Sequence, residues 1–155
     1  MLPSITATPL RSGDILVVDD SAKDVRLIRE VLREQGLKHR LHIAHDGGEA
    51  LRMLRRQPPH DDLPSPDLVL LDINLPTLSG VEVLESIKQD PELRMLPVLM
   101  LSTSRADSDV SACYARHANG YLVKPSNYDE FADLMQLTLR YWLERTQPPP
   151  RPTVQ

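Results

Sequence analysis

Short apolar runs alternate along the chain with amphipathic stretches of helical length, and this alternation constrains the fold more than any other feature. The run Leu68 to Leu71 is apolar on both faces, which is typical of a central strand in a parallel sheet. Crossovers of helical length favour a right-handed, doubly wound α/β sheet of five parallel strands and five helices. The expected strands are residues 15–18, 41–44, 68–71, 98–101 and 121–123. The expected helices run from the N-cap Ser21 to Gly36, over about 48–56, 81–88 and 108–118, and over an extended 128–146.

Prolines indicate where the folded part begins and ends. The chain has 155 residues and 14 prolines, six of which lie near the two ends, while four crowd the connection at 58–66. Clusters of this kind are typical of loops and flexible termini. We therefore expect a flexible N-terminal segment at 1–11, one domain at 12–146, and a flexible Pro-rich tail at 147–155.

Composition argues against several classes of function. A net charge of −4 offers no general attraction to nucleic acid phosphates. The longest charge-free stretches span about ten residues against the roughly 18 needed to cross a bilayer, and the first ten residues lack signal-peptide features. The single cysteine, Cys113, can form no internal disulfide. We therefore expect a cytoplasmic protein that binds neither nucleic acid nor a membrane.

Polar residues follow the carboxyl ends of four of the expected strands. They are Asp19 and Asp20, Asp72, Ser102 and Thr103, and Lys124. Each has a simpler explanation by itself, such as a helix-capping turn for the aspartate pair. Together they predict one site, because the carboxyl ends of parallel strands meet at the edge where such sheets bind ligands.

The three carboxylates of this site require a positive partner, since two of them 4 Å apart repel by about 4 kcal/mol at an effective dielectric constant near 20. Mg²⁺ prefers oxygen ligands and bridges readily to phosphate oxygens, so it fits best. Lys124 adds a movable positive charge. The Ser102 hydroxyl and the Thr103 backbone N–H can donate to an anionic oxygen.

These residues resemble the receiver domain of two-component response regulators, a flavodoxin-like fold, over about residues 14–146. The resemblance implies that Asp72 is the phosphoacceptor. It also implies that Asp20 binds Mg²⁺ directly, that Asp19 acts mostly through water, and that Asn74 offers its backbone carbonyl to the metal.

The same resemblance assigns the conformational switch. It implies that Lys124 pairs with the phosphoryl group, that the Ser102 hydroxyl moves toward it, and that Tyr121 is the aromatic side chain that turns inward on activation. It also implies a cis peptide bond before Pro125, which an X-Pro bond allows at low cost.

Three positions depart from the usual family pattern. Thr103 stands where a small Ala or Gly is commoner, so phosphoryl access and dephosphorylation are expected to be slower. His117 replaces the glycine that often ends the fourth helix, and Ser126 replaces the usual phenylalanine. With the Pro-rich loop and the aromatic pair at 141–142, these departures are similar to the single-domain regulators that serve phytochrome histidine kinases.

The resemblance therefore implies a stand-alone response regulator that receives a phosphoryl group on Asp72 from a phytochrome-type histidine kinase, with Mg²⁺ as cofactor. Such a protein catalyses its own phosphotransfer and dephosphorylation and is not otherwise an enzyme. One alternative is a hydrolase of the haloacid dehalogenase type, although that family needs Asp-x-Asp where this chain has Asp19, Asp20 and Ser21. Another alternative is a dimeric scaffold that does not respond to phosphate.

The last helix is apolar around most of its circumference. If one stripe of the helix faces the sheet, a second stripe with Leu139, Trp142 and Leu143 is left exposed unless a partner covers it. We therefore expect a homodimer through this helix, with the aromatic and aliphatic side chains at the centre of an isologous contact.

Overall fold

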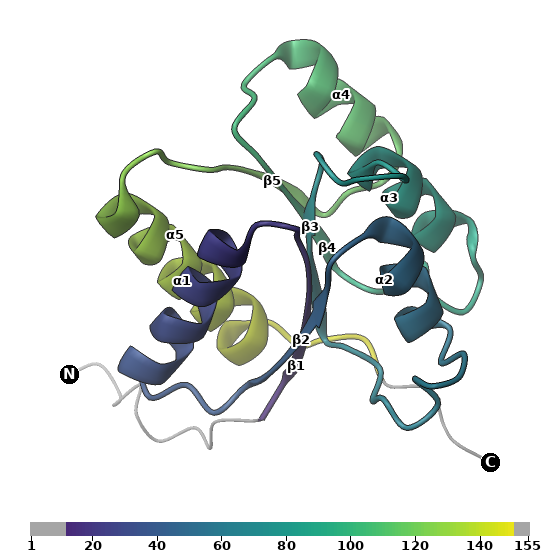
Figure 1. The fold of residues 1–155 in the computed structure, drawn as a ribbon, viewed down its shortest axis with the longest axis horizontal. Coiled ribbons are helices and arrows are strands. Elements are labelled where there is room, and N and C mark those ends of the chain that lie inside the picture. Colours follow the sequence, from purple (N-terminus) through teal and green to yellow (C-terminus); the bar gives the residue numbers. More distant parts are fainter. Residues whose placement is uncertain (1–11, 151–155) are drawn as a thin grey trace.

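The structure, a computed structural model, describes residues 12–150, so the expected N-terminal segment 1–11 lies outside the described residues. Five strands form one parallel sheet in the order β2-β1-β3-β4-β5 (Figure 1). The strands are β1 (Asp14–Val18), β2 (Arg40–Ala44), β3 (Leu68–Asp72), β4 (Val98–Ser102) and β5 (Gly120–Val123). The expected doubly wound sheet is therefore confirmed.

Five helices alternate with the strands. They are α1 (Ala22–Glu34), α2 (Gly47–Leu54), α3 (Gly80–Gln89), α4 (Asp107–Ala115) and α5 (Tyr128–Arg140), which η2 (Tyr141–Arg145) continues as a π-helical turn. Ser21 is the N-cap of α1, as expected, and its hydroxyl oxygen accepts a hydrogen bond from the Asp24 N–H. No helix among residues 12–150 combines the length and apolar character that a bilayer crossing requires.

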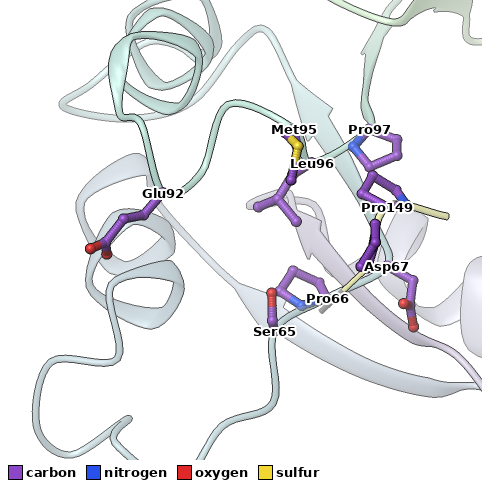
Figure 2. A pocket seen from close by; sticks show the side chains of 9 residues that line it. Ser65, Pro66, Asp67, Glu92, Met95, Leu96, Pro97 and Pro149 are labelled. Atoms are coloured by element: carbon purple, nitrogen blue, oxygen red, sulfur yellow. The ribbon is translucent and has the colours of Figure 1, made fainter. Parts of the chain in front are cut away.

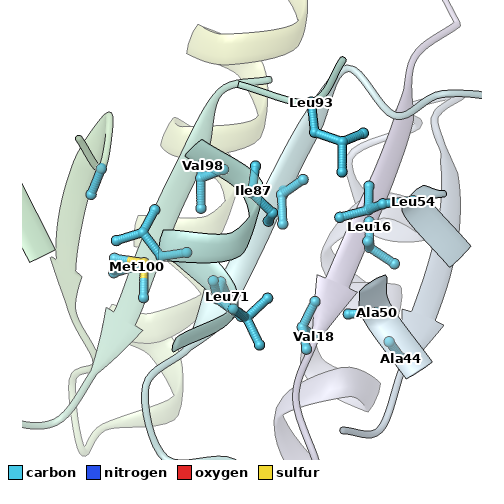
Figure 3. Close-up of a cluster of buried hydrophobic side chains, with 14 of the residues drawn as sticks. Leu16, Val18, Ala44, Ala50, Leu54, Leu71, Ile87, Leu93, Val98 and Met100 are labelled. Carbon is cyan, nitrogen blue, oxygen red and sulfur yellow. The ribbon is translucent and has the colours of Figure 1, made fainter. Parts of the chain in front are cut away.

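The helices cover both faces of the sheet, with α1 and α5 on one side and α2, α3 and α4 on the other (Figure 1). Successive residues of a strand point to opposite faces, so Leu16 and Val18 of β1 pack toward α2 and α3 (Figure 3), whereas Ile15 and Val17 pack toward α1 and α5. All five residues of β3 are buried. This two-sided burial explains why its sequence lacks the alternation of a half-exposed strand.

The last helix presents a different face to the sheet than we expected. Leu139 and Leu143 are 0% and 3% exposed and belong to the core beneath α5, and Trp142 packs partly against the same core. The expectation that Leu139 and Leu143 lie on a free stripe is therefore wrong, because they follow Met135 at the four-residue spacing of the sheet-facing side. The exposed large apolar residues of the described part of this helix are Tyr128, at 48%, Leu137, at 69%, and Tyr141, at 54%.

The first residues of the Pro-rich tail contact the domain. Pro149 and Pro150 line a shallow pocket with Pro66 and Pro97 at the start of β3 and β4, where Met95 is also exposed (Figure 2). This end of the sheet is opposite to the edge that carries the acidic residues. The rest of the tail, 151–155, lies outside the described residues.

Two backbone features bear on the expected departures from the family pattern. Among residues 12–150 the cis peptide bond is the one before Pro59, so the bond before Pro125 is trans and the expected cis bond there is wrong. His117 has a left-handed φ of 70°, and the N–H groups of His117 and Ala118 donate to the carbonyls of Tyr114 and Cys113. This pattern closes α4 at a position where glycine is usually preferred, which explains why the family often has glycine there.

Candidate functional site

Two acidic residues meet where the order of the strands reverses. Val18 pairs with Leu71 in the sheet, so Asp19, directly after β1, lies beside Asp72 at the end of β3. One carboxylate oxygen each from Asp19, Asp20 and Asp72 lie within 4.8 Å of one another. Asp19 and Asp72 are buried and Asp20 is exposed, so the cluster opens to solvent on one side.

Lys124 lies directly after β5 and its ammonium enters this cluster. The Nζ atom lies 2.9 Å from Asp72 Oδ2, 2.9 Å from Asp24 Oδ2 and 3.4 Å from Asp19 Oδ2. The backbone N–H of Lys124 donates to the Ser102 carbonyl at 2.8 Å, which extends the pairing of β4 and β5 by one bond. Because the Lys124 side chain is only 9% exposed, these ion pairs are shielded from water.

Burial and charge shift the pKa of two groups in this site. Burial has the largest influence on Asp19 and raises the pKa of its carboxyl to about 6, while the Ser21 N–H and Lys124 act in the opposite direction. Burial alone would lower the pKa of Lys124, but hydrogen bonds to Asp72 and Asp24 outweigh it and raise the pKa above its ordinary value. At pH 7 the site therefore holds a charged Lys124 ammonium beside an Asp19 carboxyl whose ionised form is disfavoured by burial.

The hydroxyl groups predicted for the site come from the end of β4, the loop after it and β5. Ser102, at the end of β4, is buried, and its Oγ accepts a hydrogen bond from the Ser104 N–H at 3.0 Å. The Tyr121 hydroxyl donates to the Ser104 carbonyl at 2.9 Å, and Ser104 Oγ donates to Asp109 on α4. Ser104 thus links Ser102, Tyr121 and α4 through three of its own polar groups.

Two other predicted residues flank the cluster. Asn74 is exposed, and its backbone N–H donates to Asp72 Oδ1 at 3.0 Å, which orients that carboxylate. Thr103 is exposed directly beyond Ser102. Both therefore lie within two residues of a group of the site in the chain, whereas the predicted surface residues Leu139 and Leu143 belong to the core under α5.

Sequence reasoning missed Asp24. This residue is in the first turn of α1, one turn after Asp20, and its carboxylate is as close to Lys124 as that of Asp72. The signal was available in principle, because a helix that begins directly after β1 must start at the same edge of the sheet as Asp19. Acidic residues are common in a first helical turn for reasons of helix stability alone, so the position by itself did not indicate a role in the site.

The residues present fit a divalent cation with hard oxygen ligands. Three carboxylates, on Asp19, Asp24 and Asp72, contact the Lys124 ammonium, and that of Asp20 lies within 4.8 Å of two of them, so among the described residues the carboxylates of this partly buried pocket outnumber its ammonium. Three of them, on Asp19, Asp20 and Asp72, are near enough to one another to share one ion. Carboxylate oxygens with access to water are the ligand set that Mg²⁺ and Mn²⁺ accept.

A parallel sheet with this strand order and an acidic cluster at its switch point is the arrangement expected of a phosphoacceptor domain of signalling proteins. The chain belongs to the response regulator receiver domain family, whose pattern matches residues 15–136. It is therefore a phosphoacceptor and not a classical enzyme, which argues against the hydrolase alternative.

Among its relatives, the chain is similar to the response regulator Rcp1 of Synechocystis sp., with 43% identity over 130 residues, which cover 84% of this chain and 88% of that protein. The crystal structure of the Mn²⁺-bound form of Rcp1 has a TM-score of 0.84 at 41% identity, covering 89% of this chain and 99% of that one. The crystal structure of the phosphorylated cyanobacterial phytochrome response regulator RcpA has a TM-score of 0.86 at 36% identity, covering 90% of this chain and 100% of that one. The expected likeness to single-domain phytochrome regulators is thus confirmed.

Proposed function

We propose that Asp72 accepts a phosphoryl group from a sensor histidine kinase in a Mg²⁺-dependent reaction, and that the protein signals through contacts with other proteins. The observation that carries this proposal is the position of the Asp72 carboxylate, beside the acidic pair and in contact with the Lys124 ammonium at the open edge of the sheet. A phytochrome-type kinase is the partner that the relatives favour, since RcpA is a phytochrome response regulator.

The reaction forms a phosphorus–oxygen bond and breaks a phosphorus–nitrogen bond. An oxygen of Asp72 attacks the phosphorus of the kinase phosphohistidine in line, and the imidazole leaves with the electron pair of the broken bond. The Lys124 ammonium offsets the negative charge on the transferred oxygens. A Mg²⁺ ion held by Asp19, Asp20 and Asp72, with the Asn74 carbonyl as a further ligand, would supply additional charge neutralisation. The Mn²⁺-bound form of Rcp1 supports a divalent ion in this family.

The proposed output begins at Ser102. Once the acyl phosphate forms, the Ser102 side chain turns toward it so that its hydroxyl donates to a phosphoryl oxygen, and this rotation moves the Ser102 Oγ away from the Ser104 N–H that donates to it in this structure. Because Ser104 also binds Tyr121 and Asp109, this exchange shifts the conformational equilibrium of the loop that holds α4. The surface of α4, β5 and α5, with Tyr114, Leu137 and Tyr141 exposed, then presents the signal.

Incubation with acetyl phosphate and Mg²⁺ tests the proposal. We expect one alkali-labile phosphoryl group per chain, measured by Phos-tag electrophoresis and intact mass, and no labelling when EDTA removes the metal. A hydrolase would instead turn over many equivalents of assorted phosphomonoesters. A phosphate-independent scaffold would show the same partner binding and the same oligomeric state before and after phosphorylation, and that result would contradict the proposed signalling role.

We also propose that the protein forms a homodimer through the exposed face of the last helix. Asp129, Asp133, Leu137 and Tyr141 recur on this face every four residues, and the exposed Arg145 follows one turn later. An antiparallel pairing of two copies places the acidic end of one helix against the basic end of the other, with Leu137 and Tyr141 at the centre. This pairing is isologous and complementary in charge.

Leu137→Glu should dissociate this dimer, because it places a charge at the apolar centre of the contact. We expect at least about a tenfold increase in the dimer dissociation constant, which corresponds to the loss of about 1.4 kcal/mol of binding free energy. Sedimentation velocity over a range of concentrations measures it. Met95→Glu is the matched control, since Met95 is similarly exposed but lies between α3 and β4. A wild-type chain that stays monomeric, or a dimer unaffected by Leu137→Glu, contradicts the proposed interface.

A further inference from the structure

Asp24 has a different relation to Lys124 than the other carboxylates of the site. Its Oδ2 atom lies 2.9 Å from Nζ, yet among the described residues it is not part of the group that can share one metal ion, which is Asp19, Asp20 and Asp72. It is also not the proposed phosphoacceptor. Its contact with the ammonium therefore competes with neither the cation nor the phosphoryl group.

The backbone of α1 holds Asp24 in place. The residue is the third of the helix, and its N–H donates to Ser21 Oγ at 3.3 Å, so the N-cap defines where its side chain starts. Ser21 is itself anchored, since its N–H donates to Asp19 Oδ1 at 2.8 Å. The side chain of Asp24 is only 17% exposed, and the helix N-terminus favours its negative charge. Asp24 is thus a preorganised anion that does not belong to the metal cluster.

The ammonium of Lys124 has three N–H donors, and three carboxylates surround it. Two of these carboxylates change partners during the proposed reaction, since Asp19 would bind the cation and Asp72 would form a bond to phosphorus. Only the contact with Asp24 is free to persist from the metal-free state to the phosphorylated state. A lysine side chain is a flexible four-carbon stem, so an ammonium without such an anchor would sample several positions.

We propose that Asp24 is a positioning residue that keeps the Lys124 ammonium beside the phosphoryl site while Asp19 and Asp72 engage the cation and the phosphorus. This inference rests on the proposed function. Its physical basis is that a charge-assisted hydrogen bond from a fixed carboxylate reduces the freedom of the lysine before the reaction begins. The remaining two N–H donors of the ammonium are then directed toward the transferred oxygens.

Charge repulsion alone would predict that removing Asp24 speeds phosphorylation. Asp24 adds one negative charge near a site that must accept an anionic phosphoryl donor, so its removal would relieve repulsion and speed the reaction. If positioning dominates, removal slows the reaction instead. The sign of the change in rate therefore separates the two effects.

The first experiment compares Asp24→Asn with wild type in phosphorylation by acetyl phosphate and Mg²⁺. We expect the maximal phosphorylation rate to fall by about tenfold, in keeping with the cost of misplacing a reacting group, while the acetyl phosphate concentration at half-maximal rate changes less. Glu130→Gln is the matched control, because Glu130 is likewise the third residue of its helix, its N–H donates to the N-cap Asn127, and it is exposed. Asp24→Glu keeps the charge in the first turn of α1 and should recover part of the rate.

Two further measurements separate positioning from a structural role. The effect of Asp24→Asn should disappear in a Lys124→Ala background, because residues that act through one another are not additive. In the metal-free protein, the Lys124 ammonium protons should give a slowly exchanging ¹⁵N-resolved NMR signal that broadens or is lost in Asp24→Asn. Thermal unfolding of all variants checks that the fold is retained, and Asp24→Glu provides the comparison if Asp24→Asn is unstable.

The outcomes are distinct. An Asp24→Asn protein that is phosphorylated as fast as wild type, or faster, overturns the inference and leaves the proposed function intact. The same holds if Asp24→Asn slows the reaction equally with and without Lys124, or if the ammonium signal is unchanged. A wild-type protein that acetyl phosphate and Mg²⁺ cannot phosphorylate at all contradicts the proposed function itself.

Discussion

Asp72→Asn should abolish phosphorylation, with the rate of labelling by acetyl phosphate falling by at least about a thousandfold. An amide oxygen is too weak a nucleophile to attack phosphorus, and an asparagine cannot hold an acyl phosphate. The change is nearly isosteric, and the amide oxygen can still accept from the Asn74 N–H, which lies 3.0 Å from Asp72 Oδ1. We therefore expect loss of the phosphorylated band in Phos-tag electrophoresis without loss of the fold.

The control for this variant is the same substitution at an exposed aspartate far from the site. Asp62→Asn alters an exposed aspartate in the Pro-rich connection between α2 and β3 and should leave labelling unchanged. Circular dichroism of both variants verifies the fold. If Asp72→Asn were labelled at the wild-type rate, another carboxylate would be the acceptor, and peptide mapping after borohydride reduction would locate it.

Gly80→Ala should destabilise the fold by about 3 kcal/mol or more, at the upper end of what overpacking usually costs. A Cβ atom at this position would lie 2.1 Å from the carbonyl oxygen of Asp72 and 2.7 Å from the Cα of Ile73. Both are backbone atoms, which cannot move aside as a flexible side chain can. The N–H of Gly80 also donates to the Ile73 carbonyl at 2.9 Å, so the start of α3 lies against the end of β3.

Urea denaturation measures this loss, and Gly48→Ala is the control. At Gly48 the atoms nearest to a new Cβ are the side-chain atoms Arg52 Nη1 at 3.3 Å and Asp46 Oδ1 at 3.4 Å. We expect the free energy of unfolding of Gly48→Ala to stay within about 1 kcal/mol of wild type, because alanine also has a better helix propensity than glycine. Equal stability of Gly80→Ala and Gly48→Ala would mean that α3 can move away from β3 at little cost.

Gly80→Ala should also affect the phosphoacceptor, because Gly80 lies against the backbone of Asp72. Any Gly80→Ala protein that folds must push the carbonyl of Asp72 away from α3, and the Asp72 side chain moves with its backbone. Phosphorylation of the folded fraction should therefore slow as well. A glycine at this position thus allows α3 to begin directly beside the phosphoacceptor.

Much of the site was predictable because a parallel sheet converts positions in the sequence into positions in space. Once the apolar runs before Asp19, Asp72 and Lys124 were identified as parallel strands, these residues had to share one edge. The structure brings these three residues together, with the ammonium 2.9 Å from Asp72. The periodicity of the last helix was also sufficient to predict its length, to within one residue of the end of η2.

Three features were not predictable from the pattern. The stripe of the last helix that faces the sheet depends on its rotation about its own axis, and an apolar circumference leaves this rotation undetermined, so Leu139 and Leu143 were placed on the wrong side. The bond before Pro125 is trans, and because an X-Pro bond is compatible with both isomers, the sequence pattern leaves the isomer undetermined. The contact of Asp24 with Lys124 joins residues 100 positions apart and depends on where the first turn of α1 points.

The order of apolar and polar residues along the chain by itself determined the class of fold, the edge that carries the chemistry and most of the residues there, since strand burial and strand polarity are local consequences of sequence. Only the tertiary structure decided which carboxylates reach the ammonium and which apolar residues remain at the surface. Those outcomes depend on helix rotation and on side-chain packing across elements that are distant in the sequence, and no local pattern encodes either.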